Sequence, residues 1–342
     1  MTLAFVSVGD AADPATWSGI PFHTARSLRR AGADLALVSP LRTRPGTRAL
    51  AGTVLNRLRR RRVFHAERDP VVARRYSAEA ARRIRALDAG AAISTSSIPL
   101  AGADLDIPVA VWTDATFAGL LNFYPEYTSI SSRSVRDGHA LERRALARAD
   151  VLVYSSSWAA RSAVEDYDAP ADRVHVVPYG ANLEAPTREA VDAAIEARSA
   201  EHLTAVLIAA DWERKRGDFA VATVQRLNAL GKPTRLHVVG PGPPHRERLP
   251  EVVDVGGWLR KTGGQPGDPL AEVLLRAHVL LLPSLADCTP VAVSEAAACG
   301  VPVIATDSGG VGEVVVDGVN GSALPSDATP DDHAREVLRL CA

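Results

Sequence analysis

The most constraining feature of this chain is the stretch from residue 278 to 310, whose pattern predicts strand, loop, helix and strand. Val279–Leu282 is continuously apolar, as in a strand buried on both faces of a parallel sheet. Pro290 suits the first position of a helix and Thr289 can cap it, and a second apolar run follows at 301–305. We therefore expect a helix start, with its positive dipole, at the carboxyl edge of a parallel sheet, where α/β proteins bind anions.

Two acids bracket this helix start: Asp287 lies before it and Glu295 in its second turn. Solvated surface acids are one explanation of such a pair. The whole pattern, however, resembles the signature of the retaining family-4 glycosyltransferases: an acid, seven residues, a glutamate, then a small-residue helix ending in Cys-Gly-x-Pro-Val. In that family the second acid holds the ribose of a sugar nucleotide and the first contacts the donor sugar. Asp287 replaces the usual Glu, which leaves the donor sugar open.

The resemblance implies an α/β chain of the GT-B fold, in which two doubly wound Rossmann-like domains face each other across a cleft. The length of 342 residues also suits two domains, at roughly 100–200 residues each. We expect residues 1–181 to form an acceptor-binding domain and residues 182–342 a nucleotide-sugar-binding domain, with the hinge near Pro178 and Gly180.

The basic loop at residues 211–217 resembles the loop that clamps the donor diphosphate in the family. Lys215 matches the family's lysine, whereas Ala210 stands where the family's arginine is usual. Arg214 is the expected substitute, because a guanidinium bridges two phosphate oxygens. An ordinary basic turn is the alternative. By resemblance, Lys215, Arg214, Asp287 and Asp114 are the candidate catalytic residues.

Further donor contacts are expected from the helix start and from one later segment. Thr289 and the backbone amides of Val291 and Ala292 lie at the helix start, where Pro290 has no N–H to donate. Trp258 and Leu259 resemble the segment that reads the nucleotide base. With Glu295, these residues complete the donor side of the predicted second domain.

Two residues of the first domain are also candidates. Gly19 ends Trp17-Ser18-Gly19, which resembles the family's glycine loop beside the donor phosphates, although a simple turn would also need a glycine. Asp114 follows a predicted strand where many members have a histidine. It either orients an acceptor hydroxyl or amine, or caps a helix that begins near Ala115. A Gly-x-Gly-x-x-Gly fingerprint is missing from the opening residues, so no nicotinamide or flavin cofactor is expected.

No metal or other cofactor is expected apart from the sugar nucleotide. Asp104 and Asp106 resemble a metal-binding D-x-D motif, but they precede a strand instead of following one. The net charge of −1 does not favour nucleic acid. Residues 42–75 are rich in arginine, which fits a peripheral contact with an anionic membrane, an anionic acceptor or a solvated helix face. A homodimer is left open.

The three cysteines, the lack of a signal-peptide pattern and the lack of an apolar run near 18 residues predict a cytoplasmic, thiol-reduced protein. In the family, the chain usually returns to the first domain with a final helix. Residues 331–340 are helix-like, but too few residues follow for such a crossing. We expect this helix to stay on the second domain, and the two domains to be joined near residues 179–183 alone.

The implied activity is retaining, metal-independent transfer of a hexose-type sugar from a nucleoside-diphosphate sugar, with UDP or GDP, to a hydroxyl of a small-molecule, glycan or lipid acceptor. A sugar-nucleotide epimerase or hydrolase of the same fold is an alternative, and so is a non-catalytic sugar-nucleotide-binding protein. Donor breakdown without an acceptor would identify the first alternative, and binding without turnover the second. The base, sugar, acceptor and oligomeric state stay open.

Overall fold

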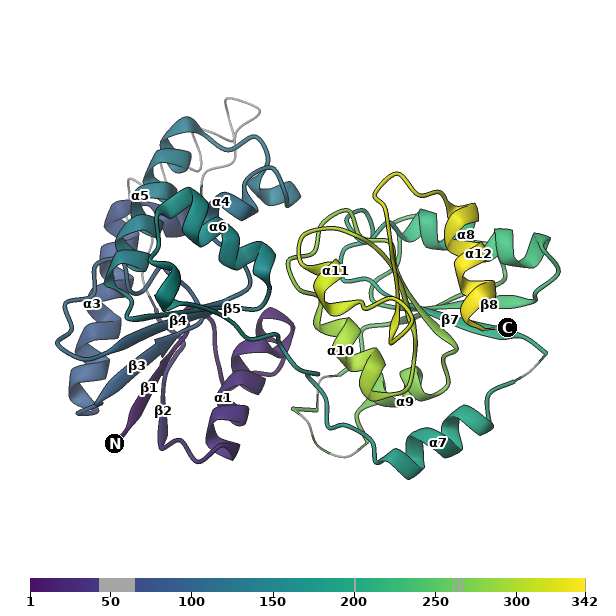
Figure 1. The fold of residues 1–342 in the computed structure, drawn as a ribbon, viewed down its shortest axis with the longest axis horizontal. Helices are drawn as coiled ribbons and strands as arrows, with labels where there is room; N and C mark the ends of the chain where they lie inside the picture. The colour runs from purple at the N-terminus through teal and green to yellow at the C-terminus, as the bar shows by residue number, and fades with distance from the viewer. Residues whose placement is uncertain (43–64, 200, 261, 264, 266, 342) are drawn as a thin grey trace. The chain divides into compact units, whose positions relative to one another are not determined.

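The computed structural model describes residues 1–42, 65–199, 201–260, 262–263, 265 and 267–341. The chain divides into two compact units, Met1–Pro178 and Tyr179–Ala342 (Figure 1). We expected the division between residues 181 and 182, and it falls between Pro178 and Tyr179. Each unit has its own sheet and its own core.

The first unit is built on a six-stranded parallel sheet of order β2-β1-β3-β4-β5-β6. Its strands are β1 (Leu3–Val6), β2 (Leu35–Val38), β3 (Ala91–Ser94), β4 (Val109–Thr113), β5 (Val151–Tyr154) and β6 (Val174–Val176). Its helices are α1 (Ile20–Arg30), α3 (Pro70–Ala86), α4 (Phe117–Leu120), α5 (Ser132–Arg148) and α6 (Ser157–Tyr167). The alternation of strand and helix is that of a doubly wound unit.

Successive side chains of one strand reach the two faces of this sheet, as the two-residue period of a strand requires. Phe5 of β1 packs with Ala25 of α1 on one face. Its neighbours Ala4 and Val6 join a second cluster, with Ile84 of α3 and with residues of α5 and α6. The sheet is therefore covered on both sides, which explains why its strands are mostly apolar.

The second unit repeats this plan with a six-stranded parallel sheet of order β12-β11-β10-β7-β8-β9. Its strands are β7 (Leu203–Ile208), β8 (Thr234–Val239), β9 (Val253–Gly257), β10 (Val279–Leu282), β11 (Val303–Thr306) and β12 (Gly321–Leu324). Its helices are α7 (Arg188–Glu196), α8 (Gly217–Ala229), α9 (Pro269–Leu275), α10 (Val291–Ala298), α11 (Val311–Val314) and α12 (Pro330–Leu340).

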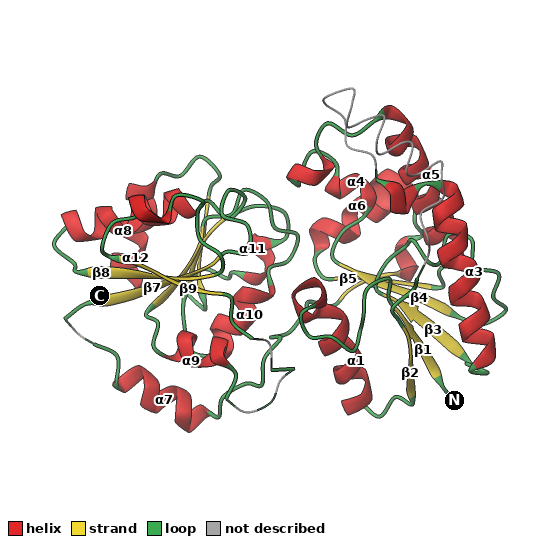
Figure 2. Ribbon diagram, turned by 180° about the vertical axis from the view of Figure 1, so that it is seen from behind, coloured by secondary structure: helices red, strands yellow, loops and turns green. Residues whose placement is uncertain are grey.

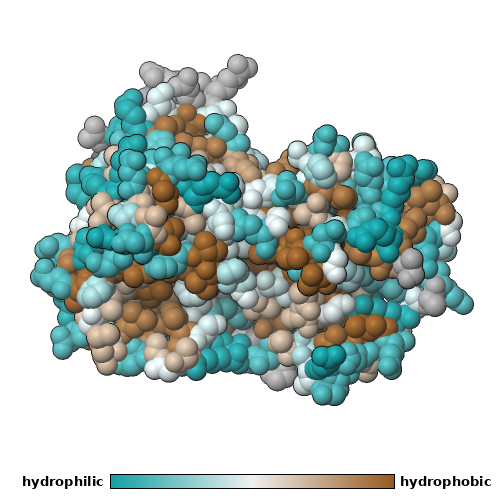
Figure 3. Space-filling model, viewed as in Figure 1, coloured by the Kyte–Doolittle hydropathy of each residue, from teal (hydrophilic) through white to brown (hydrophobic). Residues whose placement is uncertain are grey.

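Strand β10 lies inside this sheet and is buried on both sides. Val279 and Leu281 pack with residues of α8 and α12, whereas Leu280 and Leu282 pack with residues of α9, α10 and α11. Helices accordingly lie on both sides of the sheet (Figure 2). The continuous apolar run predicted this two-sided burial. On the face of the molecule that Figure 3 shows, by contrast, apolar and polar residues are interspersed.

Helix α12 packs within the second unit, against α8. Its side chains Ala334 and Val337 are fully buried in the cluster that also contains Ile304 of β11. Thr329 caps the helix through a capping box with Asp332, which satisfies the first backbone donors. This agrees with the expectation that residues 331–340 form a helix of the second unit.

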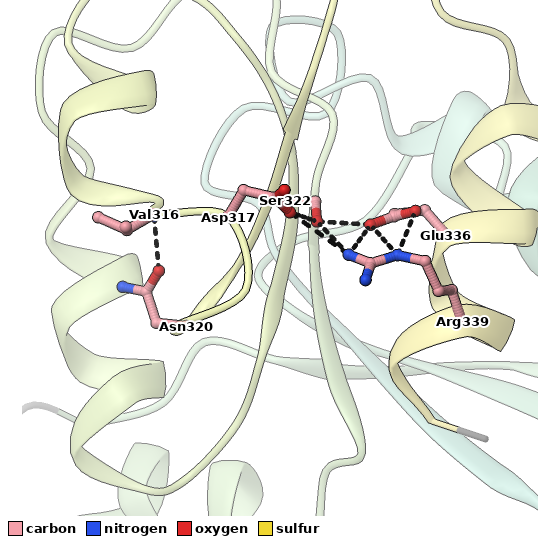
Figure 4. Close-up of polar contacts among 6 residues, drawn as sticks. All are labelled: Val316, Asp317, Asn320, Ser322, Glu336 and Arg339. Atoms are coloured by element: carbon pink, nitrogen blue, oxygen red, sulfur yellow. Dashed lines mark hydrogen bonds and ion pairs between the residues drawn. The ribbon is translucent and has the colours of Figure 1, made fainter.

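A polar network also holds α12 to β12 (Figure 4). Ser322 Oγ lies 2.7 Å from Asp317 Oδ1 and 2.5 Å from Glu336 Oε1. Arg339 donates to Glu336 Oε1 from Nε at 2.9 Å and to Asp317 Oδ1 from Nη2 at 3.3 Å. Hydrogen bonds from Arg339 lower the pKa of Glu336, so that carboxylate stays charged. The positive charge of Arg339 thereby offsets the negative charges of Asp317 and Glu336, which both contact the hydroxyl of Ser322.

Candidate functional site

Three loops of the second unit leave the carboxyl edge of its sheet, at residues 209–216, 283–290 and 307–310. They follow β7, β10 and β11, and β10 lies between the other two strands. Because the strands are parallel, their carboxyl ends lie on the same edge, where open α/β sheets bind ligands.

Hydrogen bonds join these loops to one another. Leu285 N donates to Arg214 O at 2.9 Å, which connects the loops after β7 and β10. Ser308 Oγ donates to Leu285 O at 3.0 Å, and Gly310 N donates to Cys288 O at 2.8 Å, which connect the loops after β10 and β11. The three loops therefore form one structured surface.

Two cations and one acid, the half-buried Arg214 and the buried Lys215 and Asp287, lie together between the first two loops. Lys215 Nζ is 2.6 Å from Asp287 Oδ2, and Arg214 Nη1 is 3.3 Å from Asp287 Oδ1. Arg214 Nη1 also donates to Ala286 O at 2.9 Å. Lys215 and Asp287 are only 8% and 7% exposed, and a lysine is rarely so buried unless it is paired. The structure thus brings the two predicted cations and the first predicted acid into direct contact.

The local sequence explains why the basic loop holds this shape. Trp212 is buried, and its Nε1 donates to Asp218 Oδ1 at 3.2 Å. A Cβ at Gly217 would lie 2.2 Å from the Trp212 ring, so only glycine allows α8 to begin so close to it. Asp211 Oδ1 accepts a hydrogen bond from Arg214 N at 3.1 Å. Together these contacts fix the turn that presents the cations.

The start of α10 corrects one prediction. Pro290, not Thr289, occupies the N-cap position, and no side chain caps the helix there. The ring of proline fixes φ but not ψ, and a ψ of 112° puts Pro290 outside the helix. Val291 and Ala292 are therefore the first two helical residues, and Val293 N already donates to Pro290 O at 3.1 Å. The amides predicted to meet an anion lie in the first turn, where the helix dipole is positive.

Glu295 is the second predicted acid, and it is 2% exposed in the second turn of α10. The helix is held in place next to it, because Ser294 Oγ donates to Tyr179 O at 3.0 Å. Burial, and after it the charge of Glu295, raises the pKa of Cys299 to about 11. Cys299 is consequently a protonated packing residue and not a nucleophile.

The glycine of the Cys-Gly-x-Pro sequence has a structural reason. Gly300 has a φ of +65°, and an added Cβ would meet Val191 Cγ1 at 2.7 Å and Ile195 Cδ1 at 3.0 Å. Arg198 donates to the carbonyls of Gly300 and Cys299, at 3.1 and 3.3 Å. Helix α7 and Arg198 thus close the carboxyl end of α10, and this part of the motif serves packing.

Trp258 and Leu259 follow β9, which is the outermost strand on its side of the sheet. Trp258 is 69% exposed, whereas Leu259 packs against the cluster formed with α9, α10 and α11. Strand β8 separates β9 from β7, so these residues lie further along the same edge than Lys215. An exposed indole at such a place is available to stack on a planar ligand.

Two buried hydroxyl residues of this edge were not among the candidates predicted from the sequence. Ser284 follows β10 and is 0% exposed, and Thr306 ends β11 and is 3% exposed. Neither hydroxyl has a hydrogen-bond partner among the residues that the structure describes. Because buried hydroxyls usually have a partner, they are further candidates for ligand contacts. The available signal was a hydroxyl residue at the end of each apolar run.

In the first unit, the loop before α1 has an unusual backbone. Trp17, Ser18 and Gly19 have φ values of 45°, 55° and 87°. Glycine adopts such a conformation easily, but for the other two residues it costs on the order of 1–3 kcal/mol each. Strain of this kind gathers at functional sites, which favours the functional interpretation of Gly19 over an ordinary turn.

Asp114 follows β4, as predicted, but it does not cap a helix. Helix α4 begins at Phe117, and its N-cap is Thr116, whose Oγ1 accepts from Gly119 N at 3.1 Å. The proposed cap for a helix near Ala115 was therefore wrong, because the chain stays extended through Thr116. The remaining interpretation of Asp114 is a carboxylate at the carboxyl edge of the first sheet.

Among the described residues, no group of three or more His, Cys, Asp or Glu is arranged to hold a metal ion. Asp104, of the D-x-D sequence, has a 95% exposed side chain, and its Oδ2 lies 3.1 Å from Arg85 Nη2. The motif precedes β4, as predicted, and both of its aspartates are exposed.

The arginine-rich segment falls mostly outside the described residues, since residues 43–64 are not among them. Arg68, within the described part, is buried, with Nη1 3.0 Å from Glu142 Oε2 and its guanidinium 4.5 Å from the centre of the Phe117 ring. It is thus a core residue and not part of a membrane-facing surface. No helix in the described part of the chain is long and apolar enough to span a bilayer.

Two protein families match the chain, one in each unit. The model of "Glycosyltransferase Family 4" matches residues 22–185, and that of "Glycosyl transferases group 1" matches residues 203–342. The first match covers β2 to β6 of the first sheet, and the second covers β7 to β12 of the second sheet.

Curated relatives match over part of their length. A D-inositol 3-phosphate glycosyltransferase from Nocardia farcinica is 30% identical over 202 residues, which are 56% of this chain and 45% of that protein. A putative colanic acid biosynthesis glycosyltransferase, WcaL of Salmonella typhimurium, is 29% identical over 206 residues, 57% of this chain and 49% of that protein. The chain thus spans less than half the length of these relatives.

Among solved structures, sucrose-phosphate synthase from Thermosynechococcus elongatus is similar, with a TM-score of 0.68 at 16% identity over 99% of this chain and 89% of that one. At this identity the likeness concerns the fold. The pair of Rossmann-like units is that of the GT-B fold, and with the two family matches it shows that the chain belongs to the family-4, or group 1, glycosyltransferases.

Proposed function

We propose that this protein transfers a hexose-type sugar from a nucleoside-diphosphate sugar, with UDP or GDP as the nucleotide, to a hydroxyl group of a small-molecule, glycan or lipid acceptor. The observation that carries the proposal is the group of Lys215, Arg214 and Asp287 at the edge where α10 begins. A nucleoside diphosphate gains negative charge as its bond to the sugar breaks. Fixed cations and a helix start stabilise that charge without reorganisation.

The likeness to the family suggests the following chemistry at these groups. The bond between the anomeric carbon and the diphosphate oxygen breaks, and a bond forms between the same carbon and the acceptor oxygen. The acceptor proton passes to an oxygen of the departing diphosphate, so that no protein base is required. Both events take place on one face of the sugar, which retains the anomeric configuration. Lys215 and Arg214 hold the leaving group, and we expect no metal ion in this role.

The remaining candidates have roles in binding. Glu295 would accept hydrogen bonds from the ribose hydroxyls, and Asp287 would accept one from a hydroxyl of the donor sugar. Val291, Ala292 and Thr289 would lie beside the diphosphate, and Trp258 and Leu259 beside the base. In the first unit, Gly19 would contact the donor phosphates, and Asp114 would orient a group of the acceptor.

The acceptor is a separate question, for which a relative supplies one specific test. The Nocardia farcinica protein is named for D-inositol 3-phosphate, so this compound belongs in the acceptor screen.

The thiols Cys288, Cys299 and Cys341 are all free, which suits a reducing compartment such as the cytoplasm.

The test begins with donor binding. The thermal unfolding midpoint is measured with UDP, GDP, ADP and dTDP, since a ligand at 100 times its Kd stabilises by about 2.7 kcal/mol. The matching sugar nucleotides are then incubated with D-inositol 3-phosphate, simple glycosides and lipid extracts, and the product anomer is assigned by NMR. A glycoside with the donor's anomeric configuration supports the proposal. Donor breakdown or epimerisation without an acceptor would favour the epimerase or hydrolase alternative, and binding without turnover a non-catalytic role.

A further inference from the structure

Asp287 contacts both cations of the candidate site at the same time. One carboxylate oxygen, Oδ2, lies 2.6 Å from Lys215 Nζ, and the other, Oδ1, lies 3.3 Å from Arg214 Nη1. The carboxylate therefore bridges the two cations with one oxygen for each. A phosphate group offers the same arrangement, a negative group with two oxygens that face two nitrogen donors.

The burial of this group gives the bridge an energetic role. The side chains of Lys215 and Asp287 are each 10% exposed, and that of Arg214 is 17% exposed. Removal of one partner from a buried ion pair leaves an uncompensated charge, which strongly destabilises a protein. Without Asp287, the loops after β7 and β10 would hold two cations close together with no counter-charge from this contact.

We infer that Asp287 serves as an internal substitute for the donor diphosphate, a role that rests on the proposed function of the same site. It neutralises Lys215 and Arg214 before the donor binds and competes with the diphosphate for them afterwards. This competition lowers the affinity for the nucleoside diphosphate product and so favours its release. Asp287 would thus be a positioning residue for the two cations, in addition to any contact with the sugar.

The inference predicts an unusual gain of binding. In Asp287→Asn the cations keep their places but lose the competing charge, so inorganic pyrophosphate should bind at least about ten-fold more tightly, which equals about 1.4 kcal/mol. The same variant should unfold at a lower temperature, and saturating pyrophosphate should restore the midpoint. Asp287→Glu keeps the charge and should bind pyrophosphate within about three-fold of the wild type. A merely structural role would lower stability without a gain in affinity.

The experiment uses the full chain, isothermal titration with inorganic pyrophosphate, and thermal unfolding with and without it. Asp331→Asn is the matched control, because Asp331 also contacts two cations, Arg226 and Arg335, but on the surface of α12. It should leave the pyrophosphate affinity unchanged. The double variant Lys215→Met/Asp287→Asn should fold, since it removes the buried lysine charge together with the carboxylate, and the 17% exposed Arg214 still donates to Ala286 O. It should also lose the gain in affinity.

The outcomes separate the inference from the proposed function. If Asp287→Asn binds pyrophosphate no more tightly than the wild type, the inference is wrong, whatever the protein's activity. Tighter binding in a protein that transfers no sugar would support the inference and contradict the proposed function. If Asp287→Asn cannot be obtained folded, the double variant decides: a folded double variant supports the counter-charge role, and an unfolded one contradicts it.

Discussion

Replacement of Lys215 by alanine should affect catalysis differently from replacement of Glu295. In its proposed role, Lys215 faces charge that grows as the donor bond breaks, so its loss should lower kcat. A preorganised group of this kind contributes about 100-fold or more, or roughly 3 kcal/mol. Glu295, by contrast, would hold the ribose equally in the ground state and in the transition state. Its loss should raise KM for the donor and leave kcat within a few-fold.

The structure also sets the cost in stability. Lys215→Ala removes the 2.6 Å contact to Asp287, but Arg214 remains 3.3 Å from the same carboxylate. The carboxylate thus keeps one counter-charge, and the variant should lose less than the 3–5 kcal/mol that a fully broken buried pair costs, about 2 kcal/mol. Such a protein still folds, so its kinetics can be measured.

The assay is an initial-rate series in donor concentration at saturating acceptor, with thermal unfolding monitored by circular dichroism. Lys232→Ala is the control, because Lys232 lies in the turn before β8, at the opposite edge of the same sheet. Its kcat and KM should match those of the wild type. Equal proportional changes of kcat and KM in both the Lys215 and the Glu295 variant would refute this division of roles.

Three further predictions concern pH, packing and metal. Burial lowers the pKa of His278, and its Nδ1 accepts a hydrogen bond from Thr204 N at 3.0 Å, which only the neutral ring can do. The neutral His278 ring therefore stabilises the fold above the unfolded-state pKa of about 6.5, and this contribution is lost as pH falls below that value. Thermal unfolding should accordingly show that His278→Gln loses less stability than the wild type between pH 7.5 and 5.5. Gly300→Ala should destabilise by about 2–4 kcal/mol in urea unfolding, because φ is +65° and the new Cβ would lie 2.7 Å from Val191; a change below 0.5 kcal/mol would contradict this. Activity should survive dialysis against EDTA, and restoration by Mn²⁺ after a complete loss would show that the site needs a metal.

Much of the fold could be predicted from local patterns. The strand Val279–Leu282 begins and ends at the predicted residues, and the helix predicted at residues 331–340 lies within α12 (Pro330–Leu340). Their apolar spacing records a face that must be buried, and that information lies within the segment. Helix caps were harder to predict. The cap position depends on the residue at which ψ leaves the helical range, and several neighbouring residues can be the cap in a given sequence.

The site could be predicted in part. The spacing from Asp287 to Glu295 and the basic loop at Lys215 were enough to name the main candidates. Which of them touch was beyond the sequence, since Lys215 and Asp287 are 72 positions apart and meet only because β7 and β10 are neighbours. The burial of the Ser284 and Thr306 hydroxyls could not be predicted for the same reason, because it depends on the loops that cover them.

The double attachment of α12 has a consequence for the cooperativity of the second unit. The last helix of a compact unit often frays, and its amide protons then exchange with solvent through local opening. Here the buried Ala334 and Val337 and the network of Ser322, Glu336 and Arg339 attach the helix from two sides. The middle amides of α12 should therefore exchange with deuterium only when β11 opens as well, so that helix and central sheet behave as one protected unit.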